Sequence, residues 1–261
     1  MNESRVVGIL LPFATAAALI LVWEFSVRWL QIPTYLLSPP SAIILELKRG
    51  LVDGLLWRDI GATLFAFLTG YVVGCSIALI AATLIAEFRT LERAVYPVIV
   101  ALQSVPKVAL APLIIVWFGF DLQSKVVMVA LICFFPTFVS SVVALKSCNP
   151  NLVDLYRAFS ASRWRIFTDV KLPAAFGGIF AGLQISVVLA LLGTVVAEFV
   201  SSRHGLGHTI AASTVDLNVA MMFACVVILS AIGVTATQIL KFAHHRIVFW
   251  ERGTSTAVAH I

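Results

Sequence analysis

Long apolar stretches alternate with short polar segments along almost the whole chain. A helix of about 20 predominantly apolar residues is long enough to cross a bilayer. Six stretches reach that length, at residues 6–29, 60–86, 95–119, 126–145, 174–200 and 219–240. This pattern predicts an all-α protein, a polytopic bundle of six transmembrane helices.

The longest polar segment, residues 149–173, lies between the fourth and fifth of these stretches. Asn149 and Pro150 are typical of a helix start, and Ser162 can cap a second short helix that runs to Lys171. Leu172 and Pro173 are then expected to end that helix and open the next apolar stretch. The segment is predicted to form a charged helical hairpin between two spans, and such a hairpin is a docking surface more often than a catalytic site.

Composition agrees with a membrane protein built as one domain. The chain of 261 residues is 61% hydrophobic and 12% charged, whereas soluble domains average about 25% charged residues. No polar segment is long enough to form a separate domain, so residues 1–261 are predicted to be a single transmembrane domain with core spans over 60–240. The net charge of +5 is expected to set orientation and does not indicate nucleic-acid binding.

The N-terminal region is predicted to contain a span and a surface helix. Residues 6–29 resemble an uncleaved span, because Glu24 and Arg28 lie near its end and no small-residue cleavage site follows. A proline-rich turn comes next, after which Ser41 can cap an amphipathic helix over residues 41–56. We expect this helix to lie on the membrane surface without a chemical role.

The third apolar stretch contains unusual breaks. Pro97, Pro106 and Pro112 interrupt its helical pattern, and Gln103, Ser104 and Lys107 add polar groups at the same place. Broken helices at membrane depth often line a translocation path. In the alternative interpretation, the segment re-enters from the cytoplasmic side and Lys107 reaches toward lipid phosphates. The sequence leaves both interpretations open.

The fifth apolar stretch carries three further polar candidates. Gln184 and Ser186 can line a polar path, or they can form hydrogen bonds between packed helices. Glu198 is a carboxylate within a span, which is a functional hypothesis by default. Its place near the outer end of the span equally suits an interfacial carboxylate that caps structure.

Several motifs that would indicate other functions are absent from the sequence. It contains no phosphate-cradling Gly-x-x-x-x-Gly-Lys-Ser/Thr, no His-Glu-x-x-His and no Gly-x-Ser-x-Gly. The chain is therefore not expected to be an enzyme or to bind ATP in that manner. His204 and His208 have the spacing of helical metal ligands, but Gly205 and Gly207 between them predict a loop. No metal or cofactor is predicted.

The polar segment 149–173 carries a resemblance to a known family. It resembles the EAA loop of bacterial ABC-importer permeases, in which Glu-Ala-Ala and then Gly precede a spacer that ends in Leu-Pro. Alignment on Leu172 and Pro173 places Asp154 at the Glu position and Ser160 at the Gly position. Tyr156 replaces an alanine, and serine loses the ease with which glycine adopts a left-handed backbone. The stretches ASRW and VPKVALAPLIIVWFGF are similar to the sulfonate, taurine and nitrate permease subfamily.

This resemblance implies a type I importer permease of the inner membrane that carries a small solute, such as a sulfonate, taurine or nitrate-like anion. It implies three protein partners: a dimer of a cytoplasmic ATPase, a second permease copy and a periplasmic solute-binding protein. The loop would be the coupling helix that docks on the ATPase. Its candidate residues are Asp154, Tyr156, Phe159, Ser160, Ser162, Arg163, Trp164, Arg165 and Pro173. The candidate translocation path contains Gln103, Ser104, Lys107, Gln184, Ser186 and Glu198.

The distribution of basic residues predicts the orientation. With six spans and cytoplasmic termini, eleven Lys and Arg residues fall on the cytoplasmic side and six on the other. This asymmetry favours a cytoplasmic loop 149–173. Two alternatives remain, namely a secondary transporter driven by an ion gradient and a membrane scaffold without transport activity. The former needs intramembrane charged pairs or inverted repeats, of which the sequence gives little sign.

Overall fold

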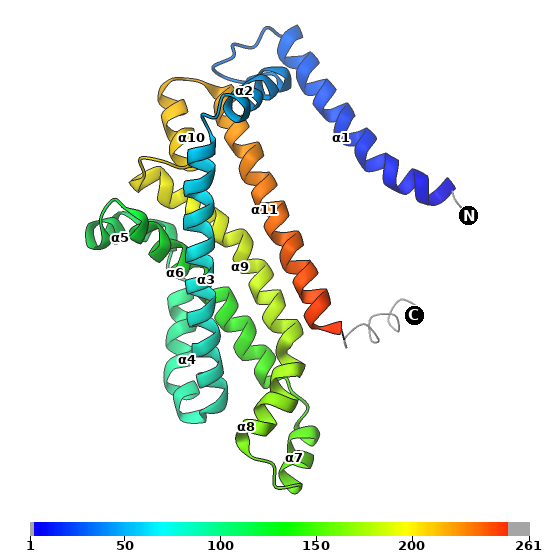
Figure 1. Ribbon diagram of the computed structural model, residues 1–261, viewed down its shortest axis with the longest axis vertical. Helices are drawn as coiled ribbons and strands as arrows, with labels where there is room; N and C mark the ends of the chain where they lie inside the picture. Colours follow the sequence, from blue (N-terminus) through cyan, green and yellow to red (C-terminus); the bar gives the residue numbers. More distant parts are fainter. Residues whose placement is uncertain (1–2, 250–261) are drawn as a thin grey trace. The chain divides into compact units, whose positions relative to one another are not determined.

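The chain folds entirely into helices and turns over residues 3–249, the part that the computed structural model describes (Figure 1). The all-α prediction is therefore confirmed. The helices in chain order are α1 (Glu3–Trp29), α2 (Pro40–Val52), α3 (Trp57–Glu87), α4 (Arg89–Gln103), η1 (Lys107–Leu110), α5 (Ala111–Phe118), α6 (Leu122–Lys146), α7 (Pro150–Ala158), α8 (Arg163–Ile166), η2 (Phe167–Lys171), α9 (Leu172–Ser201), α10 (Leu206–Val215) and α11 (Val219–Ile247).

Four of the described helical segments are long and apolar enough to cross a membrane, namely α3, α6, Arg163–Val200 and α11. A fifth span results if α4 and the η1–α5 segment count together, although they are bent by 87° at their junction. The predicted first span, 6–29, forms α1, which is not one of these segments. The number of six spans therefore stays a prediction.

The chain divides into two compact units. The first contains the residues up to Ala62 together with His204–Ser230, and the second contains Thr63–Arg203 together with the residues from Ala231 onward. The prediction of a single transmembrane domain is not tested by this division. The second unit contains the polar loop and most of the candidate residues.

In the first unit, two acidic side chains organise the polar contacts. Glu24 accepts hydrogen bonds from the backbone N–H and the hydroxyl of Ser41, at 3.0 and 2.9 Å, and it pairs with Arg28. Ser41 was predicted to cap the amphipathic helix. Instead α2 begins at Pro40 with Pro39 at its N-cap position, which has no side-chain acceptor, and Ser41 lies inside the helix with its hydroxyl bonded to Glu24.

The second acidic side chain, Asp59, holds the start of α10. Its carboxylate accepts from the Gly205 N–H at 2.9 Å and from the Thr209 hydroxyl at 2.8 Å. A carboxylate is favourable at a helix N-terminus because it meets unpaired N–H groups and the positive end of the helix dipole. The loop predicted around Gly205 and Gly207 is therefore wrong, since a helix begins at Leu206 and includes His208.

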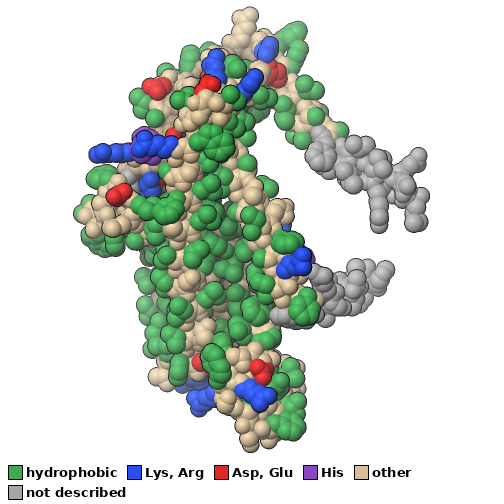
Figure 2. Space-filling model, viewed as in Figure 1, with side chains coloured by type: hydrophobic (Ala, Val, Ile, Leu, Met, Phe, Trp, Pro, Cys, Tyr) green, Lys and Arg blue, Asp and Glu red, His purple; other side chains and the backbone are tan. Residues whose placement is uncertain are grey.

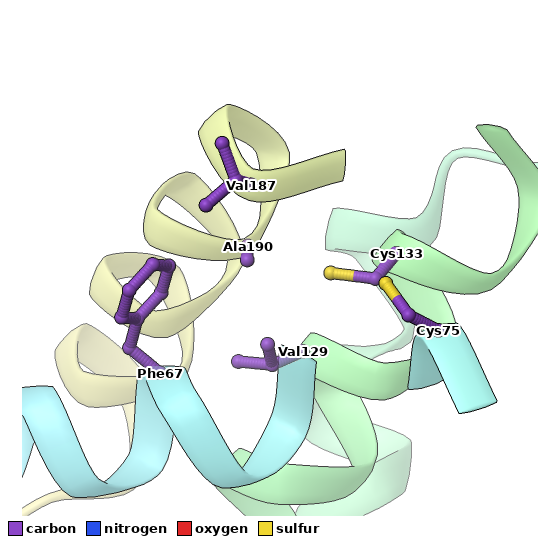
Figure 3. Close-up of a cluster of buried hydrophobic side chains, with 6 residues drawn as sticks. All are labelled: Phe67, Cys75, Val129, Cys133, Val187 and Ala190. Carbon is purple, nitrogen blue, oxygen red and sulfur yellow. The ribbon is translucent and has the colours of Figure 1, made fainter. Parts of the chain in front are cut away.

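In the second unit, α6 packs closely against α3 and α9. A Cβ atom added at Gly74 would lie only 2.6 Å from the Ala130 carbonyl oxygen, and one at Gly182 would lie 2.7 Å from the Ser140 Cβ. Small residues therefore allow these helix backbones to approach one another. Figure 3 shows the resulting core cluster, which α3, α6 and α9 share: Phe67, Cys75, Val129, Cys133, Val187 and Ala190.

The helix that begins at Arg163 continues without a break into the fifth span. The sequence predicted that Leu172 and Pro173 would end it. Instead α8 passes through the π-helical turn η2 directly into α9, and Leu172 has helical dihedral angles. Proline is tolerated in the first turn of a helix, and a wide π turn just before it relieves the clash of its ring with the preceding turn.

Candidate functional site

The loop 149–173 folds as its polar residues predict at both helix starts. The Asn149 side chain accepts a hydrogen bond from the Asn151 N–H at 3.0 Å, and Pro150 occupies the first turn of α7. The Ser162 hydroxyl accepts from the Arg165 N–H at 3.2 Å. These caps satisfy donors that a helix start otherwise leaves unpaired. They give the hairpin of α7 and α8 a defined shape.

Ser160 forms the turn between the two helices in a left-handed conformation, with a φ angle of 55°. The Ala161 N–H bonds the Tyr156 carbonyl, and the Ser160 N–H bonds the Arg157 carbonyl. This pair of bonds is a Schellman motif, whose left-handed position is usually glycine. The turn expected of the family is thus retained at Ser160, although its side chain makes this conformation costly.

The loop exposes large aromatic side chains beside basic ones. Phe159 is 79% exposed and Trp164 is 73% exposed. Arg163 is exposed between them in sequence and, among the described residues, makes no ion pair. Exposed aromatic and arginine side chains are the residue types that dominate binding at protein interfaces. Figure 2 shows the charged side chains around α7 and α8, beyond the mainly hydrophobic flank of the second unit.

Two ion pairs form within the loop. Asp154 accepts from Arg157 at 3.0 Å, and Asp169 lies 3.4 Å from Arg165. Tyr156 is half-buried in α7, and Pro173 lies in the first turn of α9. The exposed pairs are worth little to stability, so they mainly set the charge pattern of the surface.

A groove of about 1360 Å³ separates the loop from the junction of α3 and α4. Lys171 bridges to Glu87 at 2.5 Å, and Lys146 pairs with Glu92. Glu87 ends α3, Glu92 lies in the first turn of α4, and Lys146 ends α6. The sequence identified neither ion pair. The spacing of more than 50 residues between partners explains this, because no local pattern connects them.

A second group of candidate residues surrounds the broken third span. Lys107 begins η1, directly after the break at Pro106, and donates from Nζ to the Gln103 carbonyl at 2.7 Å. Gln103 and Lys107 line a cavity of about 530 Å³, whose other walls come from α6 and α9. Ser104 caps α4 and does not line this cavity. The predicted break is confirmed at Pro106, whereas Pro97 lies inside α4 without ending it and Pro112 lies in the first turn of α5, where proline is tolerated. The role of the break stays a prediction.

The polar candidate residues of α9 do not line this cavity. Ser186 is fully buried, donates to the Cys133 carbonyl at 3.0 Å and lies 2.7 Å from the Thr137 hydroxyl. Glu198 is also fully buried and accepts from the Thr63 hydroxyl at 2.9 Å. Gln184 is half-buried and does not line the cavity. Ser186 and Glu198 therefore join helices within the packed interior.

The cavity also contains residues that the sequence did not single out. Phe135 places its ring 4.5 Å from the Lys107 Nζ, and Ser140 lines the same cavity. Within apolar stretches, a phenylalanine or a serine gives no signal of such a role. Among the described residues, no group of three or more His, Cys, Asp or Glu side chains could hold a metal ion.

Curated relatives cover nearly the whole chain. The riboflavin transport system permease protein of Chloroflexus aurantiacus is 35% identical over 237 residues, which span 91% of this chain and 88% of the relative. The formylaminopyrimidine transport permease protein of Halalkalibacterium halodurans is 30% identical, over 90% and 93% of the two chains. A putative aliphatic sulfonates transport permease protein of Bacillus subtilis is 27% identical, over 93% and 87%.

Solved structures show a similar fold. An inward-facing structure of the MetNI methionine ABC transporter aligns with a TM-score of 0.64 at 21% identity, over 76% of this chain and 96% of that chain. The family described as "Binding-protein-dependent transport system inner membrane component" matches residues 70–248. This chain therefore belongs to that family of ABC-importer permeases, is a multi-pass inner-membrane transport subunit and is not an enzyme.

Proposed function

We propose that this permease is driven by a separate cytoplasmic ATPase, which docks on the loop 149–173. One observation carries the proposal. The capped hairpin exposes Phe159, Arg163 and Trp164, and its second helix continues without a break into α9. A surface of this composition suits a protein partner. The continuous helix gives that partner a stiff connection to a membrane span.

The mechanism follows from this connection. ATP binding closes the ATPase dimer and displaces the two docked hairpins. Because α8, η2 and α9 form one continuous helix, the displacement reaches the α6–α9 contact. The paired permeases then change between inward- and outward-facing states. Two sites are in this way coupled through a shared two-state element.

The assembly contains three further features. A second copy of the permease completes the translocation path, and a periplasmic binding protein delivers the solute. Both termini and the loop 149–173 lie on the cytoplasmic side, in agreement with the excess of basic residues assigned to that side. Arg163 and Arg165 are proposed to make polar contacts to the ATPase, whereas Phe159 and Trp164 fill its groove.

The transported solute is proposed to be a small anion of the sulfonate, taurine or nitrate kind. Support comes from the relatives whose names refer to aliphatic sulfonates and taurine. The names of other relatives refer to riboflavin and formylaminopyrimidine. A common permease architecture thus serves chemically different solutes.

Transport in proteoliposomes tests the driving force. The permease is reconstituted with its co-purified ATPase and binding protein, and uptake of the bound solute is measured. We expect uptake with ATP and Mg²⁺, no uptake with a non-hydrolysable ATP analogue, and no effect of an ionophore. Uptake that needs an ion gradient and ignores ATP would instead establish the secondary-transporter alternative.

A further inference from the structure

We propose that the cavity beside the break in the third span is a solute-contact site for an organic anion with an apolar body. This inference rests on the proposed function and narrows it to sulfonate-like anions with an apolar body, because it assigns part of the solute selectivity to the permease itself. The cavity lies within the second unit and is formed by the α4–η1 junction, α6 and α9. Its residues combine one positive charge, an aromatic ring and apolar walls.

The ammonium group of Lys107 is held in place from two sides. Its Nζ donates to the Gln103 carbonyl at 2.7 Å and lies 4.5 Å from the centroid of the Phe135 ring. A lysine ammonium has three donors and gains a cation–π attraction from an aromatic face. The carbonyl uses one donor, so donors remain for a ligand in the cavity.

The charge of Lys107 has no protein counterion. No aspartate or glutamate lines the cavity, and Lys107 makes no ion pair within residues 3–249. A charge in an apolar, partly desolvated place is costly unless it is paired. An anionic group on the solute supplies the missing counterion. Ser140 adds another polar side chain on the cavity wall.

The remaining walls select against small hydrated ions. Ile185, Leu189 and Leu192 of α9 face the cavity together with Ile132 and Val139 of α6. Ile185 and Leu192 are more than half exposed, so the cavity is open along α9. Burial of apolar surface favours a ligand with a hydrocarbon or aromatic body, whereas nitrate offers none. The cavity volume of about 530 Å³ falls in the range of about 300–1,000 Å³ typical of small-molecule sites.

Binding to the purified full-length permease tests this site without any need for transport. The protein is placed in nanodiscs of zwitterionic lipid, and binding of 1-naphthalenesulfonate is measured by calorimetry. Nitrate and uncharged naphthalene serve as comparison ligands. We expect the sulfonate to bind at least about tenfold more tightly than either, as one charge-assisted contact and one buried ring each supply such a factor.

Variants of the lysine identify the contact. Lys107→Met is expected to weaken sulfonate binding by about tenfold or more, and Lys107→Arg is expected to retain it. Lys241→Met removes a lysine that does not line the cavity, so it should bind like the wild type. Size-exclusion profiles confirm that each variant is folded. Equal binding by Lys107→Met and the wild type would overturn the proposal.

An anionic lipid headgroup is the competing occupant of the cavity, and the same variants distinguish it from a solute anion. If anionic lipid co-purifies with the wild type but not with Lys107→Met, the Lys107 ammonium binds a lipid headgroup. This result would overturn the proposed solute site. Failure of this inference differs from failure of the proposed function. ATP-driven uptake can persist in a permease that binds no sulfonate, and the binding assay gives its answer even if uptake proves to be ion-driven.

Discussion

The hairpin of α7 and α8 and the contact between α6 and α9 belong to the same compact unit, but their side chains have different surroundings. In α7 no residue is buried, and Phe159 and Trp164 are mostly exposed. In the α6–α9 contact, glycines lie against neighbouring helices, and Ser186 is fully buried. The hairpin keeps its shape through caps, whereas the core keeps its shape through close packing.

In the proposed mechanism, this difference separates a surface that would receive a partner from a body that would transmit the partner's movement. A close-packed core responds to force as a unit, because changes of even one methylene group are felt by its neighbours. The hairpin contributes little to the core, so its exposed side chains can be changed with little loss of stability. Substitutions in the two regions are therefore expected to affect different measurements.

The largest effect is expected where two helix backbones are closest. Gly74→Ala places a Cβ atom 2.6 Å from the Ala130 carbonyl oxygen, and it should lower the free energy of unfolding by about 3 kcal/mol because a backbone must shift. Denaturant titration in mixed micelles measures this quantity. The control is Gly61→Ala on the same helix, where nothing lies within 4 Å; it should stabilise the protein by about 1 kcal/mol. Equal effects of the two variants would contradict the close-contact interpretation.

A smaller loss is expected from the buried carboxylate. Glu198→Leu removes the acceptor of the Thr63 hydroxyl, which should lower the free energy of unfolding by about 2 kcal/mol because a buried donor loses its partner. The double variant with Thr63→Val should lose less than the sum of the two single variants. Strict additivity in the same titration would show that the pair does not act as a unit.

The anchor between the loop and α3 should have an intermediate effect. A double-mutant cycle on Lys171 and Glu87, whose side chains are 22% and 26% exposed, should give a coupling energy of about 1 kcal/mol. The exposed pair Arg157 and Asp154 serves as the control and should show no measurable coupling. A larger coupling energy for Arg157 and Asp154 than for Lys171 and Glu87 would show that the Lys171–Glu87 pair does not hold the loop to α3.

The smallest effect is expected at the turn of the hairpin, and it has the opposite sign. Ser160→Gly should raise the free energy of unfolding by about 0.5 kcal/mol, since glycine adopts the left-handed conformation without the steric cost of a side chain. Ala158→Gly, at a helical position of α7, should instead lower it by about 1 kcal/mol. Destabilisation by Ser160→Gly would mean that the serine side chain contributes an additional contact.

Features set by local sequence were predictable in both regions. The caps at Asn149 and Ser162 and the break at Pro106 follow from residue type and position, and they are confirmed. Features that depend on partners far away in the sequence were not predictable from it. Ser41 is bonded to Glu24 and does not cap α2, and α10 begins against Asp59, which is far away in the sequence.

Two further features of the candidate sites were beyond local patterns. The helix continues through Pro173 because a π turn precedes it, and no propensity rule anticipates such a turn. Phe135 meets Lys107 only because α6 packs beside the broken span. The candidate residues of the loop and the cavity were thus partly visible in the sequence, whereas their neighbours became visible only in the fold.

The most direct test of the docking claim is a pull-down of the solubilised permease from its native membrane. Wild type is compared with Arg163→Glu in the hairpin and with Arg58→Glu at an exposed arginine in the first turn of α3, outside the hairpin. We predict that an ATPase subunit accompanies the wild type and Arg58→Glu but is lost from Arg163→Glu, while all three variants remain folded. Retention of the ATPase by Arg163→Glu, or its absence from the wild type under mild conditions, would contradict docking on this loop.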